Sequence, residues 1–403
     1  MNFPHSVLVR ILFPLVILLS MEITSVVCLH LLQTAGFRYQ FISDLYPDEE
    51  TKRIVLKRIE DDDLNTGHIS MDSELGWTLR PRGLGDQLQK KGLYHVNDQG
   101  FRGTGSVALE PADGITRIMA LGDSFTFGSE VRDADAWPAL LATTLPQVEV
   151  LNSGVPGYGN DQAFLLSQRL VSKFHPQIVL LGFQPENANR NVNVFRAFYS
   201  NDHYLPFTKP RFLLKDGVLE LIQNPLQTTE EYRKVYADPR TYFPVLGKQD
   251  EFYGRHLSDR SLLDRSATVR LLRLALLKLV FPKPPIVSDN LFSSKAEAVQ
   301  VTIAIMDAWY DGLSAQGVAP VILILPNHVM LEEYHKSGWL MHQVFLDHWK
   351  GRGMRVLDLT HPFGDDSRGI LGLYLAGHYS PAGTNLVAGR VADYLRSQGL
   401  VSH

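Results

Sequence analysis

The sequence predicts an α/β fold, in which helices cover both faces of a parallel five-stranded sheet. Short, continuous apolar runs recur from about residue 115 onward and alternate with helical segments, which is typical of strands buried on both faces. Turn residues follow these runs, as they do at strand ends. The expected strands are Ile118–Leu121, Val148–Leu151, Ile178–Leu181, Val318–Leu325 and Met354–Leu357, and the expected covering helices are Ala136–Thr144, Gln162–Phe174 and Val387–Leu395.

Length and composition limit the possible classes of protein. The chain has 403 residues, enough for two or three domains or for one large domain with insertions. It is 45% apolar and 20% charged, which excludes a disordered chain, a collagen-like repeat and a disulfide scaffold. The chain has 39 basic and 43 acidic residues and a formal net charge of -4, so we expect no nucleic-acid partner. We expect a stub and anchor at 1–36, a stalk and lead-in at 37–110, and the main domain at 111–400.

An apolar segment from Ile11 to Leu32 is long enough to cross a membrane as a helix. Glu22 interrupts it, but the many Leu, Ile, Val and Phe residues outweigh one carboxylate on the insertion scale. We therefore expect a single-pass anchor with the rest of the chain outside the cytoplasm, in the periplasm or at the cell surface. A cleaved signal peptide and a buried core helix remain alternatives. Cys28, the only cysteine, excludes a disulfide within the chain.

Three further segments receive a prediction. Residues 37–70 are polar and charged, as in a stalk or a surface helix. Within an insertion at about 195–294, Arg211–Ile222 places Asp-Gly between two alternating runs and predicts a β-hairpin. Thr268–Val280 is amphipathic and basic, which favours a helix that covers the sheet, with contact to a membrane surface as the alternative.

The chemistry is concentrated in four loops that follow strands. The first strand runs into Gly122–Gly128 (GDSFTFG), where Ser124 stands at a tight strand-to-helix turn that exposes its hydroxyl. By itself the tripeptide Gly122-Asp123-Ser124 is weak evidence for a catalytic serine, because Asp and Ser also cap helices. The other loops are Asn152–Gly159, Gly182–Asn187 and Gly377–Gly383, and His378 is expected to open the last helix. In a parallel sheet these loops converge on one crevice, where a nucleophile, oxyanion donors and a base suit acyl transfer.

The four blocks, in this order, resemble those of the SGNH/GDSL hydrolase superfamily over roughly residues 72–395. Upstream, Leu75–Trp77 and Asn97–Gly103 are similar to a lead-in seen in membrane-anchored bacterial members. The resemblance implies a three-layer α/β/α fold of the flavodoxin-like type, with no cofactor. It also implies ester hydrolysis through an acyl-serine.

The resemblance also implies a role for each matching residue. Ser124 would be the nucleophile and His378 its general base. The backbone amides of Ser124 and Gly157 and the side chain of Asn187 would form the oxyanion hole.

This sequence departs from the family pattern beside the histidine. Leu375 and Ala376 occupy the positions where members usually carry the orienting aspartate. Either Asp365 or Asp366, about a dozen residues upstream, could supply that acid. A Ser–His dyad and an inactive binding site remain open. Ala188 also replaces an aspartate that often follows the Asn187 block.

Some residues near these blocks are candidates for other roles. Asn189 and Arg190 are expected to bind a sugar-like substrate. Asp358 and Thr360 are expected to cap the loop beside His361, and no metal-ligand spacing is present.

The function expected from these features is that of a membrane-anchored serine esterase. Its substrate would be a small acyl ester, such as acetyl, on a cell-envelope or exported polysaccharide. An O-acyltransferase that uses the same serine is one alternative, and a catalytically silent glycan-binding or assembly protein is another.

Overall fold

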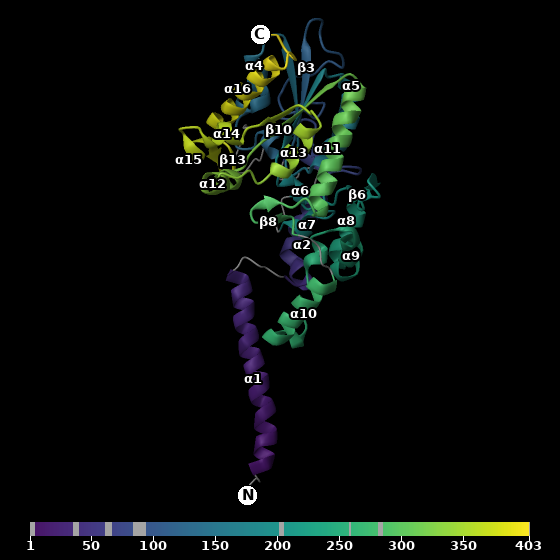
Figure 1. The fold of residues 1–403 in the computed structure, drawn as a ribbon. Coiled ribbons are helices and arrows are strands. Elements are labelled where there is room, and N and C mark those ends of the chain that lie inside the picture. The colour runs from purple at the N-terminus through teal and green to yellow at the C-terminus, as the bar shows by residue number, and fades with distance from the viewer. Residues whose placement is uncertain are drawn as a thin grey trace.

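The computed structural model describes residues 5–34, 40–60, 67–83, 94–200, 205–257, 259–280 and 285–402. Figure 1 shows a body of sheet and helices, from which helix α1 (His5–Thr34) projects as a long rod. Helix α10 (Ala267–Val280) lies beside the part of α1 nearest the body.

The central sheet has five parallel strands in the order β11-β10-β5-β3-β4. This confirms the predicted sheet, with each strand within two residues of its expected start. The bounds are β3 Thr116–Gly122, β4 Val148–Gly154, β5 Ile178–Phe183, β10 Ala319–Ile324 and β11 Val356–Asp358. Gly122 pairs with Gly154 on one side and with Gly182 on the other, so the loops after these three strands leave the sheet side by side.

Helices bury both faces of the sheet, which explains the continuous apolar strands. In β3, Met119 and Leu121 belong to one core cluster, whereas Ile118 and Ala120 belong to the other. The first cluster receives apolar side chains of α5 (Asn160–Phe174), α11 (Glu297–Ala315) and α13 (Gln343–Gly351). The second receives those of α4 (Trp137–Thr144) and α16 (Pro381–Ser397).

Shorter elements connect these layers. The helices are α2 Glu49–Glu60, α3 Ser124–Phe127, α6 Asn187–Arg190, α7 Arg196–Tyr199, α8 Thr229–Ala237, α9 Pro239–Leu246, α12 His328–Ser337, α14 Thr360–Gly364 and α15 Gly369–Leu373. The strands are β1 Ile69–Asp72, β2 Gly76–Leu79, β6 Arg211–Lys215, β7 Val218–Ile222, β8 Val287–Ser288, β9 Leu291–Phe292, β12 Tyr374–Leu375 and β13 His378–Tyr379. The 3₁₀ turns are Ile42–Leu45, Asp133–Asp135, Gly247–Gln249, Tyr253–Arg255 and Leu262–Arg265.

The segment expected to be a stalk or surface helix packs onto the body. Helix α2 buries Val55 and Ile59, four residues apart, in the first core cluster and contacts α8. Strands β1 and β2 then form an antiparallel hairpin. Of the two predicted alternatives, the surface helix is therefore the one observed, because Val55 and Ile59 lie on one face of α2 and are buried whereas Ile54 is exposed.

Within the insertion, one prediction is confirmed and one is wrong. Strands β6 and β7 form the expected hairpin, and Asp216 and Gly217 take the positive φ values of 51° and 79° that its tight turn requires. Helix α10 does not cover the sheet. Its apolar residues Leu271 and Leu274 instead form a cluster with Leu29 of α1. Figure 1 shows α10 beside α1 and away from the sheet.

Helix α1 contains the apolar segment predicted from the sequence. Its stretch Leu12–Thr34 is long and apolar enough to cross a membrane, by length and composition. A signal sequence satisfies the same criterion.

A buried ion pair joins the start of α5 to the insertion. Lys209 Nζ donates to Asp161 Oδ2, and both side chains are almost completely buried. Burial raises the pKa of Asp161 and lowers the pKa of Lys209, so each charge depends on the other for compensation.

We expect Lys209→Met to lower the free energy of unfolding by about 3–5 kcal/mol, because it leaves a buried carboxylate without its cation. The measurement is urea unfolding of the full chain in detergent, followed by tryptophan fluorescence. Lys215→Met is the matched control, since its ion pair with Glu220 is exposed and should contribute under about 1 kcal/mol. Equal losses in the two variants would contradict this prediction.

Candidate active site

Ser124 is the first residue of the short helix α3, directly after β3. The side chain of Asp123 caps this helix by accepting a hydrogen bond from the backbone amide of Phe125 at 2.9 Å. Gly122 has φ +145°, and a Cβ there would lie 2.4 Å from Thr126 Oγ1. The turn before the serine therefore requires glycine, both for its backbone conformation and for space.

His378 contacts the serine directly. The distance from its Nε2 to Ser124 Oγ is 2.8 Å, which is hydrogen-bond length for a nucleophile and its base. His378 lies on β13, which pairs antiparallel with β12 across Ala376 and Gly377, both with positive φ. The sequence predicted that His378 opens the following helix, and this is wrong. Ser380, two residues later, caps α16 instead.

The donors expected to form the oxyanion hole stand in loops that leave the sheet beside Ser124. Within the described residues, no acceptor is found for the backbone amides of Ser124 and Gly157. Asn187 Nδ2 donates to Asp123 Oδ2 at 3.0 Å, and its second hydrogen can serve another acceptor. Gly157 has φ +83°, and a Cβ there would lie 2.4 Å from Leu205 Cδ1.

Asp123 connects the loops around the serine. Besides Asn187, its Oδ2 accepts a hydrogen bond from Arg190 Nη1 at 3.2 Å. The same Arg190 nitrogen donates to the backbone oxygen of Tyr158 at 2.9 Å, next to Gly157. Arg190, expected from the sequence to bind substrate, therefore supports the loops of the site. Asn189 beside it is half-buried.

The lead-in segment holds the Gly157 loop from both sides. Trp77 Nε1 donates to the backbone oxygen of Pro156 at 2.9 Å, and Tyr158 Oη donates to the backbone oxygen of Trp77 at 2.6 Å. Both side chains are buried. The sequence places Trp77 in the lead-in but gives no indication of this contact.

Arg102, also in the lead-in, fastens the turn that follows Ser124. Its buried guanidinium donates to the backbone oxygens of Phe127, Gly128 and Val131. A guanidinium can do this because it carries five donors in a fixed plane. The backbone between Phe127 and Val131 is thereby fixed, and it includes Glu130.

Glu130 is the acid that the structure places beside His378. Its Oε1 lies 3.8 Å from His378 Nδ1, and its side chain is 14% exposed. Glu130 has φ +77°, a conformation that non-glycine residues rarely adopt and that is often found at functional sites. This left-handed backbone has no signature in the sequence, which is why the residue was missed.

Of the two aspartates considered as orienting acids, Asp366 is engaged elsewhere. Arg368 binds Asp366 through two side-chain hydrogen bonds and lowers its pKa to about 2. Asp365 ends α14, where its backbone amide donates to the oxygen of His361. Among the described residues, the carboxylate found at His378 is that of Glu130 and not of either aspartate.

The loop after β11 contributes structure. Asp358 Oδ1 accepts hydrogen bonds from the amide and hydroxyl of Thr360, in the capping arrangement expected from the sequence. Its Oδ2 contacts His342 Nε2 at 3.0 Å. His361 Nδ1 lies 2.8 Å from the hydroxyl of Tyr334.

Similar chains are found among solved structures. No family model and no curated relative matches the sequence. Among solved structures, the chain is similar to a lipase/acylhydrolase from Enterococcus faecalis, with 12% identity, a TM-score of 0.36 and coverage of 70% of this chain and 97% of that chain. It is also similar to a GDSL-like lipase from Bacteroides thetaiotaomicron, with 8% identity, a TM-score of 0.36 and coverage of 72% of this chain and 93% of that chain. A third similar structure is the esterase EstA from Pseudoalteromonas, with 11% identity, a TM-score of 0.34 and coverage of 70% of this chain and 98% of that chain.

The structure itself has the three-layer α/β/α arrangement that the resemblance implies, with five parallel strands and a core cluster on each face of the sheet.

We expect Glu130→Gln to lower kcat by about 10- to 1000-fold, because an amide orients the imidazole and stabilises the imidazolium less well than a carboxylate does. The measurement is the pH–rate profile with an aryl acetate. Its acidic limb should move to lower pH, since a nearby carboxylate favours protonated histidine. Asp366→Asn is the matched control and should leave both rate and profile unchanged. An unshifted profile in Glu130→Gln would exclude an electrostatic role for this residue.

Proposed function

We propose that this chain is a serine esterase with Ser124 as nucleophile and His378 as general base. The 2.8 Å contact between His378 Nε2 and Ser124 Oγ carries the proposal. The contact joins residues 254 positions apart in the chain, at the end of a parallel sheet where such sites form. Glu130 is proposed to orient the imidazole.

The geometry suits acyl transfer in two steps. In the first, Ser124 Oγ attacks the ester carbonyl while His378 Nε2 takes the hydroxyl proton, and that proton then passes to the departing alcohol. The oxyanion receives hydrogen bonds from the amides of Ser124 and Gly157 and from Asn187. In the second step, His378 takes a proton from water, which attacks the acyl-serine, and Ser124 leaves with that proton.

We propose a small acyl group, such as acetyl, as the part that is transferred. Ser124 is only 8% exposed, so a short acyl chain reaches it with less rearrangement than a long one. The proposed carrier of the ester is a cell-envelope or exported polysaccharide. The proposed location supports this choice of substrate, with α1 anchoring the catalytic domain outside the cytoplasm.

We expect the purified full chain to hydrolyse an aryl acetate with a kcat/KM at least about 10-fold above that for the corresponding octanoate. A fluorophosphonate should label the protein covalently on Ser124. Ser124→Ala should lose both the label and the activity, whereas Ser129→Ala, which removes a hydroxyl in the same turn, should keep both.

The outcomes separate this proposal from its alternatives. Labelling together with acyl transfer to an added oligosaccharide, at a rate above that of hydrolysis, would show an O-acyltransferase. A folded chain that binds acetylated oligosaccharide but is neither labelled nor active would show a binding or assembly protein. Hydrolysis of octanoate as fast as acetate would contradict the small acyl group.

A further inference from the structure

Glu22, in the middle of the apolar helix α1, caps the amino terminus of α10. Its carboxylate accepts hydrogen bonds from the hydroxyl of Ser266 at 2.7 Å and from the hydroxyl of Thr268 at 2.9 Å. It also accepts bonds from the backbone amides of Ala267 and Thr268. A carboxylate at this position satisfies orphan amides and complements the helix dipole. Glu22 is therefore a structural part of a two-helix unit.

The rest of the contact between the two helices lies on one stripe of α1. Ser25 and Leu29 are buried, at three and seven residues after Glu22. Leu29 packs with Ala267 and Leu274 of α10, and Ser25 provides the small side chain that close helix packing uses. Most other described residues of α1 are exposed, and only 11% of its most apolar window is buried.

These contacts fix the depth of α10 relative to α1. Glu22 lies near the middle of the stretch Leu12–Thr34 that is suited to a membrane. Because Ser266 and Thr268 bond to its carboxylate, the start of α10 reaches the same depth as Glu22 wherever α1 is placed. A charged side chain within a bilayer is costly and almost always has a partner, and α10 supplies one here.

The segment around α10 presents apolar side chains away from α1. Leu262 and Leu263, in the turn before the helix, are 76% and 68% exposed. On α10, Leu272 and Leu276 are each 58% exposed, and Leu279 is 76% exposed. This is a concentration of exposed leucines that a surface in water rarely carries, and it is typical of a lipid or protein contact.

Basic residues accompany these leucines. Arg273 pairs with the buried Asp264, and Arg260 pairs with Asp44, where the chain leaves α1 for the body. Arg265 adds an exposed guanidinium. Long basic side chains near apolar ones extend toward headgroups, and several of them favour an anionic lipid surface.

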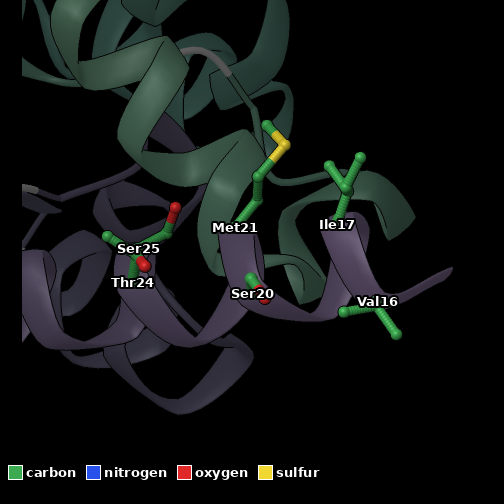
Figure 2. A pocket seen from close by; sticks show the side chains of 6 residues that line it. All are labelled: Val16, Ile17, Ser20, Met21, Thr24 and Ser25. Carbon is green, nitrogen blue, oxygen red and sulfur yellow. The ribbon is translucent and has the colours of Figure 1, made fainter. Parts of the chain in front are cut away.

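Beside Glu22, the surface of α1 has a shallow hollow with a mainly apolar lining. Figure 2 shows this hollow, which is lined by Val16, Ile17, Ser20, Met21, Thr24 and Ser25. Its lining residues all belong to α1, and none of them lies near Ser124 in the sequence.

We propose that residues 259–280 form a second membrane-contacting element, which enters the bilayer beside α1 and returns to the body as α10. Lipid acyl chains cover its exposed leucines, and its arginines meet anionic headgroups. This inference rests on the proposed anchoring by α1. It makes the catalytic domain a rigidly seated body with two membrane contacts, since a single helix would leave it free to swing.

The test measures lipid exposure at single cysteines in the full chain. Cys28→Ser provides the background, into which Leu263→Cys, Leu276→Cys, Val27→Cys and Lys215→Cys are placed one at a time. Each variant is labelled with bimane and reconstituted into vesicles of phosphatidylcholine and phosphatidylglycerol that contain lipids spin-labelled on the acyl chain. Val27 reports on α1, and Lys215, on the exposed hairpin, reports on water.

We expect the labels at 263, 276 and 27 to be quenched several-fold more than the label at 215. Quenching at 27 without quenching at 263 and 276 would overturn the second element and leave the anchor intact. Labels at 263 and 276 that become shielded from water without being quenched would show a protein cover and also overturn it. Absence of quenching at 27 would overturn the anchoring and this inference with it. Each variant must keep the tryptophan emission of the parent chain.

Discussion

The site is organised around one buried carboxylate. Asp123 has no solvent exposure, and its two oxygens hold the amide of Phe125, the side chain of Asn187 and the guanidinium of Arg190. Because Arg190 also holds the oxygen of Tyr158, the loops after three adjacent strands depend on a single charge. Inside a protein such hydrogen bonds to a charge are stronger than neutral ones, and they fix geometry well. The proposed nucleophile and the proposed oxyanion donors thus share one support.

Much of this architecture was accessible from the sequence, for a physical reason. Strands buried on both faces must be apolar throughout, so all five appear as continuous runs, and their order along the chain places the loops at one edge. Ser124 and His378, which contact each other in the candidate site, lie in sequence blocks that can be recognised by their glycines and helix-capping residues. Continuous apolar runs and local turn chemistry were sufficient to predict these features.

The sequence could not reveal contacts that depend on tertiary placement. Glu130 lies beside His378 because its backbone is left-handed, and the residue type alone does not predict that conformation. Arg102 and Trp77 act on backbone oxygens, and every residue has one. Helix α10 has an amphipathic pattern that would suit a sheet face as well as another helix, and its true neighbour lies more than 200 residues earlier in the chain. Periodicity shows which face is apolar but not what covers it.

The contacts of Trp77 and Arg102 have a consequence for modularity. Both residues precede residue 111, where the alternating pattern of strands and helices suggests that the catalytic unit begins. Yet they clamp the loop that carries Gly157 and the turn that carries Glu130. A gene fragment that encodes only the sheet and its helices would therefore specify the proposed nucleophile and base without the contacts that hold the neighbouring loops in position. The unit that recombination or engineering must transfer intact starts at the β1–β2 hairpin.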